Sequence, residues 1–263
     1  MSDASPPVIE VQDVTIAYGD YVVQKDISFD VRRGEVFVIL GGSGCGKSSL
    51  LKTMIGLYRP ATGHILFDGE DIVTAEGDER LRLLRKFGVM YQSGALFGSM
   101  TVLENVCLPL DEFTDLGAEE KTLVAAAKLN QVGLLPAAAR KPSALSGGMQ
   151  KRAGIARAMA LDPGILFLDE PSAGLDPITS AGLDQTIREL SKGLGITFVV
   201  VTHELQSIYA IADRCIMLDA RTKTAIAEGV PASLRDHSKD PYVRQFFLRE
   251  AAPAVSATNG SPS

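Results

Sequence analysis

A glycine-rich stretch that ends in lysine and serine carries the strongest chemical signal in this sequence. It reads GGSGCGKSS and comprises Gly41, Gly42, Ser43, Gly44, Cys45, Gly46, Lys47, Ser48 and Ser49. Residues 41–48, the glycine-rich loop, match the pattern G-x-x-x-x-G-K-S, in which backbone amides surround phosphate oxygens, the lysine adds a cation and the serine hydroxyl ligates Mg²⁺. An apolar run precedes the loop and a helical pattern follows it, as this motif requires. The sequence therefore predicts a nucleotide-phosphate site.

Two adjacent acids supply the second half of such a site. They end the apolar run ILFLDE at residues 165–170. Asp169 follows a buried strand and is expected to hold Mg²⁺, directly or through water. Glu170 is expected to polarise the attacking water as a general base. No guanine-reading N-K-x-D pattern occurs between residues 165 and 230, which favours ATP over GTP as the substrate.

A second stretch suited to phosphate lies much further along the chain. LSGGMQKR at residues 145–152 places Ser146, Gly147 and Gly148 before a helical pattern, with the basic Lys151 close behind. Small residues leave the first amides of a helix uncovered, and these amides together with the helix dipole favour an anion. A glycine-rich cap on an ordinary helix is the other interpretation of this stretch.

The pattern of apolar residues predicts the elements that position these stretches. Segments of strand character span residues 8–16, 21–31, 35–40, 64–72, 165–170 and 196–204. The first two alternate as antiparallel strands do, the fourth resembles an edge strand, and the continuous apolar runs suit covered strands. Residues 47–57 read as a helix, and residues 93–160 show helical periodicity without a buried strand. Buried strands that alternate with helices indicate an α/β fold with a largely parallel sheet.

Composition narrows the class of protein. The 263 residues carry a net charge of −6, which opposes binding of nucleic acid. Apolar runs of about half a dozen residues fall far short of the ~18 that span a bilayer, and MSDASPP lacks the features of a signal peptide. The three cysteines form no metal-type pair and suit a reducing cytosol. We therefore expect a cytoplasmic protein that reaches a membrane only through a partner.

Five motifs together resemble those of ATP-binding-cassette (ABC) ATPases. The glycine-rich loop, LSGGM at 145–149, ILFLDE, SAGLD at 172–176 and VTHE at 201–204 occur in the order seen in that family. The resemblance implies a P-loop NTPase core with a mixed, largely parallel sheet, an antiparallel β subdomain and a helical insert at about 93–160. These parts would form an ATP-binding domain over residues 1–235. Residues 236–263 would be a C-terminal extension, and the small, polar and Pro/Gly/Ser-rich composition of AAPAVSATNGSPS predicts that its end is disordered.

The resemblance also implies that the second phosphate-binding stretch serves another subunit. In this family the LSGGQ-type signature of one subunit contacts the γ-phosphate held by the loop of its partner. Ser146, Gly147 and Gly148 would then bind the partner's ATP in a head-to-tail homodimer. Met149 stands where most family members have glutamine, and methionine cannot make the hydrogen bonds of glutamine. This departure points to a branch of the family in which LSGGM is usual.

Four further roles follow from the resemblance. Tyr18 matches the aromatic residue that stacks on adenine, although a tyrosine in a β-hairpin often only packs. Gln92 matches the glutamine that links the Mg²⁺ site to the helical insert. His203 matches the switch histidine that contacts the γ-phosphate, although a histidine after a strand is often a cap or a surface residue. Asp176 matches the loop that communicates across the dimer.

A narrower resemblance points to the ATPases that serve MCE-protein lipid transporters. It rests on residues 92–110, 175–180, 201–218 and 241–247. It implies phospholipid transport from the cytoplasmic face of the inner membrane, with integral-membrane permease subunits, an MCE protein and a STAS-like subunit as partners. An ATPase of an importer for amino acids or other small solutes, and a soluble ATPase of metal-cluster assembly, remain as alternatives.

The stretch QSGALFGSM after Gln92 is a candidate surface for the permease. Leu96, Phe97 and Met100 would line a groove that receives a short cytoplasmic helix of the permease, since exposed apolar groups need such a partner. The alternative is that Leu96 and Phe97 belong to the core of the helical insert.

Overall fold

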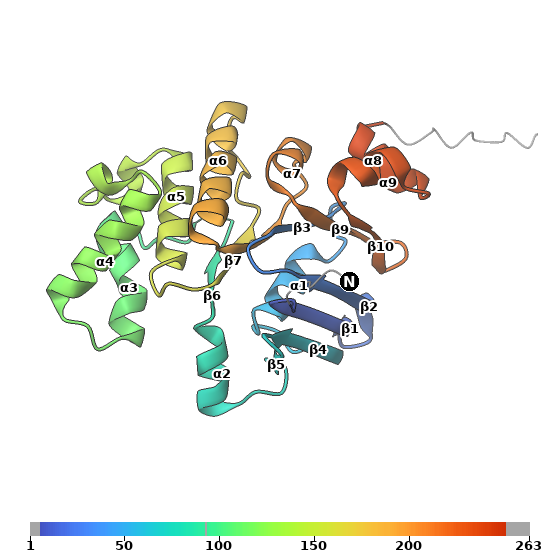
Figure 1. Cartoon of the computed structure of the whole chain (residues 1–263), viewed down its shortest axis with the longest axis horizontal. Coiled ribbons are helices and arrows are strands. Elements are labelled where there is room, and N and C mark those ends of the chain that lie inside the picture. Colours follow the sequence, from blue (N-terminus) through green and yellow to red (C-terminus); the bar gives the residue numbers. More distant parts are fainter. Residues whose placement is uncertain (1–5, 93, 251–263) are drawn as a thin grey trace, which may run out of the picture.

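Two β-sheets and a group of helices build the molecule (Figure 1). The computed structural model describes residues 6–92 and 94–250. A six-stranded sheet has the strand order β10-β9-β3-β8-β7-β6, and a four-stranded sheet has the order β2-β1-β4-β5. The described segments thus confirm the expected α/β fold with a mixed sheet and an antiparallel β subdomain.

The six-stranded sheet is parallel except at one edge. Its strands are β3 (Val36–Gly41), β6 (Phe87–Met90), β7 (Ile165–Asp169), β8 (Thr197–Val201), β9 (Arg214–Asp219) and β10 (Thr224–Gly229). Only β10 runs antiparallel to its neighbour, β9. Because the carboxyl ends of parallel strands meet at one edge of a sheet, the residues after β3, β6, β7 and β8 gather there.

The central strand β3 is buried on both faces, as its continuous apolar sequence predicts. Val36, Val38 and Leu40 pack into one hydrophobic cluster together with the helical insert. Phe37 and Ile39 pack into a second cluster, which also holds the four-stranded sheet and α1 (Lys47–Met54). The alternation of side chains along one strand therefore joins the two layers of the protein.

The four-stranded sheet is antiparallel throughout. β1 (Ile9–Tyr18) and β2 (Tyr21–Val31) confirm the predicted strand pair. The single edge strand predicted for residues 64–72 is wrong. β4 (Thr62–Phe67) lies inside the sheet, and the two-residue β5 (Glu70–Asp71) forms the edge after a turn in which Asp68 and Gly69 have positive φ. Turn residues that tolerate a left-handed backbone divide the run.

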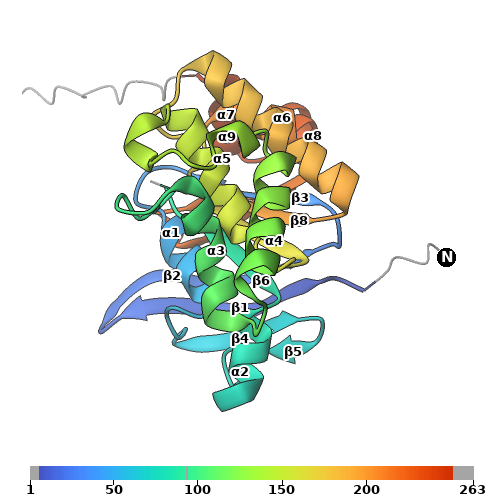
Figure 2. The ribbon, with the colours of Figure 1, turned by 90° about the vertical axis from the view of Figure 1, so that its left-hand side faces the viewer.

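The segment of the chain that connects β6 to β7, for which the sequence predicts no buried strand, is largely helical (Figure 2). They are α3 (Val102–Phe113), α4 (Ala118–Gln131), α5 (Gly147–Ala158) and two short 3₁₀ turns, Leu135–Ala137 and Pro142–Ala144. Thr101 starts α3 with a capping box, because its side chain accepts from the Glu104 amide while Glu104 accepts from the Thr101 amide. α2 (Gly77–Leu84) precedes β6.

The remaining helices follow the other strands. α6 (Pro177–Leu194) follows β7, α7 (Leu205–Ile211) follows β8, and α8 (Pro231–His237) and α9 (Pro241–Leu248) follow β10. Residues 251–263, for which the sequence predicts a disordered end, lie outside the described residues. Within residues 6–92 and 94–250, no helix is both long enough and apolar enough to cross a membrane.

Gly88 allows the signature-bearing helix α5 to lie against β6. A Cβ atom added at Gly88 would stand 1.9 Å from the carbonyl oxygen of Ala158. We therefore expect Gly88→Ala to reduce the free energy of unfolding by about 1–3 kcal/mol, the usual cost of overpacking. Chemical denaturation measures this change, and Gly98→Ala, whose Cβ would meet open space, is the matched control. Equal stability of the two variants would contradict this account of the contact.

Candidate functional site

The glycine-rich loop joins β3 to α1 and depends on glycine at its two ends. Gly41 has φ 151° and Gly46 has φ 92°, values that residues with a side chain rarely adopt. A Cβ at Gly41 would also lie 2.4 Å from the carbonyl oxygen of Leu218 in β9, and one at Gly46 would lie 2.8 Å from Val23 in β2. The neighbouring strands therefore press the loop into a shape that only glycine permits.

Lys47 begins α1 and turns back over the loop. Its side chain is largely buried, with the residue 9% exposed, and Nζ donates to the carbonyl oxygens of Gly41 at 2.9 Å and Gly42 at 3.1 Å. These bonds hold an ammonium group at the mouth of the loop, beside the first amides of a helix. That combination suits the binding of a phosphate group.

A cavity of about 630 Å³ opens in front of the loop. Its lining brings together predicted residues from separate parts of the chain: Gly41, Gly42, Ser43, Gly44, Gly46, Lys47, Ser48, Ser49, Gln92, Glu170 and His203. The last three follow β6, β7 and β8, so the parallel sheet delivers them to the same edge. Cys45 does not line the cavity and lies buried beneath the loop.

Glu170 and His203 contact each other in this cavity. His203 Nδ1 lies 2.8 Å from Glu170 Oε1, while the buried Glu170 Oε2 has no hydrogen-bond partner among the described residues. Glu170 also has φ 47°, a left-handed backbone that is uncommon for a residue with a side chain. One carboxylate oxygen is thus held by the histidine, and the other is left for a group that enters the cavity.

Asp169 ends β7 directly beside this pair. Burial and the neighbouring Glu170 raise the pKa of its carboxyl group, while the charges of Lys52 and Lys47 and a hydrogen bond with Ser48 oppose that rise. Its Oδ1 is buried without a hydrogen-bond partner among the described residues. A buried carboxylate oxygen without a partner, next to a serine hydroxyl, fits the oxygen ligands that Mg²⁺ prefers.

The described residues hold no group of three or more His, Cys, Asp or Glu side chains placed to bind a metal.

Tyr18 lies near the cavity but does not line it. It is 48% exposed, its hydroxyl group is 3.3 Å from Ser49 Oγ, and its ring meets the Tyr58 ring edge to face. The ring thus packs on Tyr58, and its exposed part is open to contact with a base.

The signature segment, LSGGM at residues 145–149, does not line the cavity either. Ser146 caps α5 by accepting from the Met149 amide at 3.3 Å, so the plain role of a helix cap is present. A Cβ at Gly148 would lie 2.3 Å from Thr179 of α6, so this glycine also permits packing between α5 and α6. Ser146 and Gly147 are exposed, whereas Lys151 is 6% exposed and does not extend the anion-binding surface.

Asp176 is the cap of α6. Its Oδ1 accepts from the amides of Ile178 and Thr179, each at 3.0 Å. Asp176 thus has a local structural role as the N-cap of α6.

Three residues of the site were missed by the sequence analysis. Val23 of β2 and Phe246 of α9 line the cavity. Gln24 is fully buried, and its Nε2 donates to the carbonyl oxygens of Cys45 and Asp219, so it ties the loop to β9. A glutamine in an otherwise alternating strand was the available signal for Gln24. The sequence did not indicate that Phe246 lies at the cavity, because α9 is far from the loop in the chain.

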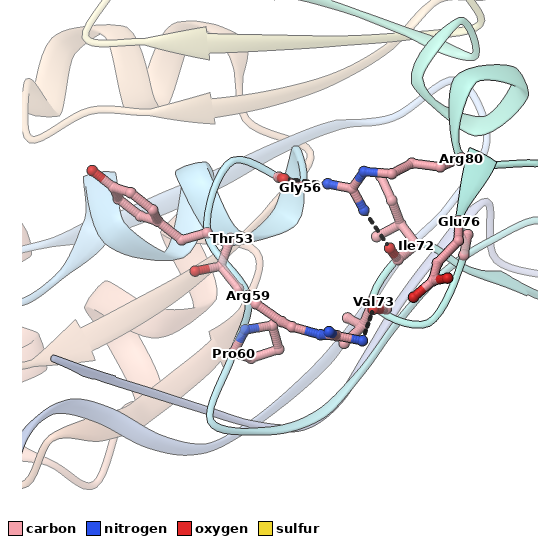
Figure 3. A pocket seen from close by; sticks show the side chains of 10 residues that line it. Thr53, Gly56, Arg59, Pro60, Ile72, Val73, Glu76 and Arg80 are labelled. Atoms are coloured by element: carbon pink, nitrogen blue, oxygen red, sulfur yellow. Dashed lines mark hydrogen bonds between the residues drawn. The ribbon is translucent and has the colours of Figure 1, made fainter. Parts of the chain in front are cut away.

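A second cavity, of about 240 Å³, lies between the end of α1 and the start of α2 (Figure 3). Arg80 donates to the carbonyl oxygens of Ile72 and Gly56, and Arg59 donates to that of Val73. These guanidinium groups cross-link the backbone of two neighbouring segments. None of the predicted site residues lines this cavity, so we assign it a structural role.

The candidate permease surface is divided between core and solvent. Leu96 packs against the main hydrophobic cluster, so the core interpretation holds for this residue. Phe97 is 52% exposed, although its backbone is fixed by two hydrogen bonds with the buried Asn105 of α3. Met100 is half-buried, and Ser93 lies outside the described residues.

Comparison with known proteins supports the motif assignment. The model of the ABC transporter family matches residues 24–173. The probable ribonucleotide transport ATP-binding protein mkl of Mycobacterium leprae is 40% identical over 239 residues, which are 91% of this chain and 68% of that protein. The intermembrane phospholipid transport system ATP-binding protein MlaF of Escherichia coli K12 is also 40% identical, over 247 residues, which are 94% of this chain and 91% of that protein.

A solved structure shows a similar fold. The dimeric post-hydrolysis state of the ATP-binding cassette MJ0796, bound to ADP and Pi, superposes with a TM-score of 0.75 at 32% sequence identity. The match covers 84% of this chain and 98% of that one.

Proposed function

Because the chain belongs to the ABC transporter family and is an ATPase whose hydrolysis of ATP is coupled to transport, we propose that the transported substrate is a phospholipid. The observation that carries this proposal is the match to MlaF over 94% of this chain and 91% of the relative. The equal identity to mkl favours a ribonucleotide as the second candidate, but that match covers only 68% of mkl. The chain resembles MlaF over nearly the full length of both.

In the proposed reaction, the residues of the large cavity divide the work of ATP hydrolysis. Lys47 and the amides of the glycine-rich loop bind the phosphates, and Glu170 accepts a proton from the attacking water. His203 would orient Glu170 through their 2.8 Å contact. It would also contact the γ-phosphate, as the family resemblance implies. Ser48, Gln92 and Asp169 would hold Mg²⁺, which neutralises phosphate charge. Tyr18 would stack on adenine, since its ring is exposed beside Ser49.

The proposed active unit is a head-to-tail homodimer. Ser146 and Gly147 are exposed at the start of α5 but do not line the cavity of their own chain. With Gly148 they would complete the ATP site of a second copy, as the family resemblance implies. The dimeric structure of MJ0796 supports a dimer for a cassette of this fold.

We assign the membrane contact to a surface beside the loop that follows β6. An apolar pocket of about 210 Å³ lies between α2, β6, α3 and α5, and the exposed side chains of Leu81 and Phe113 border it. Gln92 of the ATP cavity follows β6. Arg157, which lines the pocket, donates to the carbonyl oxygens of Gly94 and Ala95, just before the exposed Phe97. A permease helix seated here would therefore contact both β6 and Phe97. Through this contact the chain would lie at the cytoplasmic face of the inner membrane, with an MCE protein and a STAS-like subunit as further partners.

Glu170→Gln tests the proposed general base. The variant keeps the shape of the side chain and loses its basicity, so we expect ATP affinity to persist and turnover to fall by about 10²–10⁴-fold. The ATP-bound dimer should also accumulate, because closure is not reversed by hydrolysis. Turnover and size-exclusion chromatography with ATP measure the two effects. A rate close to that of the wild type would remove Glu170 from this role.

Defined heterodimers test the head-to-tail arrangement. Lys47→Ala in one copy and Ser146→Arg in the other place both changes in the same composite site and leave one site intact. Both changes in a single copy damage each site once. We expect the first design to hydrolyse ATP faster than the second, provided that one intact site is active. A heterodimer of Lys47→Ala with the wild type is the control, because its residual activity shows whether one intact site suffices. If that control is active, equal rates of the two designs would exclude the arrangement.

The substrate and the permease contact are tested in one reconstituted complex. We expect the chain, purified with the permease from its own source and placed in phospholipid vesicles, to move a labelled phospholipid in the presence of ATP. Phe97→Asp should abolish association with the permease while ATP binding remains, because it puts a charge into an apolar contact. Leu123→Asp, at another exposed apolar side chain, is the matched control.

Two results would contradict these assignments. Transport of a labelled ribonucleotide without movement of phospholipid would replace the proposed substrate with the second candidate. Normal assembly of the Phe97→Asp variant would exclude Phe97 from the permease contact, and a loss of soluble protein would return it to the core.

A further inference from the structure

A buried lysine on the signature-bearing helix has no role in the site described so far. Lys151 lies in the second turn of α5, after the Ser146 cap, and is only 6% exposed. Lysine is almost never buried without partners, because removing its charge from water is costly. Its position therefore calls for groups that compensate the ammonium charge.

Two backbone carbonyl groups from separate loops of the ATP site compensate this charge. Lys151 Nζ donates to the backbone carbonyl oxygen of Gln92 and lies 3.5 Å from that of Glu170. The first carbonyl follows β6 and the second follows β7. One ammonium group thus joins the segment that carries Gln92 to the residue that we assign as the general base.

Nearby carboxylates favour the charged form of this lysine. Burial lowers its pKa, and the nearby carboxylates of Glu204, Glu170 and Asp169 act in the opposite direction. Each of these acids follows or ends a strand at the same edge of the sheet. Lys151 therefore adds to Lys47 and Lys52 in offsetting the negative charge of these side chains.

The backbone of Glu170 is the part of the site that most needs support. Its φ of 47° is strained for a residue with a side chain. Its amide donates to the Val201 carbonyl at 2.8 Å, its carbonyl accepts from Ala173 at 3.1 Å, and its side chain contacts His203. Lys151 is the contact that links this residue to α5, and it links Gln92 to the same helix.

The same helix holds the segment after Gln92 at a second point. Arg157, further along α5, donates to the carbonyl oxygens of Gly94 at 2.9 Å and Ala95 at 2.7 Å. A displacement of α5 would therefore move this segment and the Glu170 carbonyl together.

We propose that Lys151 is a positioning residue that ties the signature-bearing helix to Gln92 and Glu170 of its own chain, so that engagement of the partner's ATP by α5 aligns the chain's own catalytic groups. The proposal rests on the assigned roles of Glu170 and of the signature segment. It predicts a coupling between the two ATP sites to which Lys151 contributes its contacts with Gln92 and Glu170.

Lys151→Met tests the proposal in the full-length dimer. We expect ATP affinity to stay within about twofold of the wild type, while kcat falls on the order of 10²-fold, because small displacements of a catalytic group have effects of that size. Lys151→Arg, which keeps the charge and the donors, should recover most of kcat. Lys128→Met is the matched control, since Lys128 is also buried but pairs with Asp162 outside the site.

A double variant separates this inference from the assignment of Glu170. If Lys151 acts through Glu170, then Lys151→Met should cost far less in the Glu170→Gln background than in the wild type. Full additivity of the two changes would overturn the proposal, as would a wild-type kcat in Lys151→Met. High turnover of Glu170→Gln alone would instead reject the assigned general base. If Lys151→Met fails to fold, Lys151→Gln replaces it, and a wild-type kcat there overturns the proposal equally.

Discussion

The close packing around the glycine-rich loop is the constraint on which the rest of the site depends. The loop must turn several amides toward one cavity, and it does so only because Gly41 and Gly46 adopt left-handed conformations against β9 and β2. Gln24 stabilises the loop by donating hydrogen bonds to the carbonyl oxygens of Cys45, in the loop, and Asp219, in β9. A phosphate site in this protein is therefore a product of three neighbouring strands, rather than of the nine-residue glycine-rich stretch alone.

The same sheet determines which side chains can reach the phosphate. β3, β8, β7 and β6 are parallel neighbours, so the segments that follow them emerge at one edge. Glu170 and His203 meet there at 2.8 Å although they are far apart in the chain. Among the described residues, Asp169 Oδ1 and Glu170 Oε2 are buried without a hydrogen-bond partner, so their burial carries a desolvation cost. Cationic groups such as Lys47 and Lys151 offset this cost.

The sequence predicted those strands that can be recognised from the apolar pattern of their own residues. Alternation of apolar and polar residues identified β1 and β2, which are buried mainly on one face. A continuous apolar run identified β3, which is buried on both faces. The turn at Asp68 and Gly69 was missed, since HILFDGEDI reads as one strand unless the left-handed turn is considered. Strand order, and with it the contact of Phe246 with the cavity, could not be predicted because it depends on contacts between distant segments. The inward direction of Lys151 was missed for the same reason.

The signature segment shows why residue type alone does not identify a binding role. Gly148 is explained within the chain, because Thr179 leaves no room for a side chain there, and Ser146 is explained as the cap of α5. What local structure does not explain is the exposure of Ser146 and Gly147 together with the burial of Lys151 on the same helix. In the proposed homodimer, α5 has one end in the partner's site and a side chain in its own. A helix with contacts in two sites cannot shift in one without disturbing the other, because packed elements move as units. Coupling between the two ATP sites is then a consequence of where α5 lies.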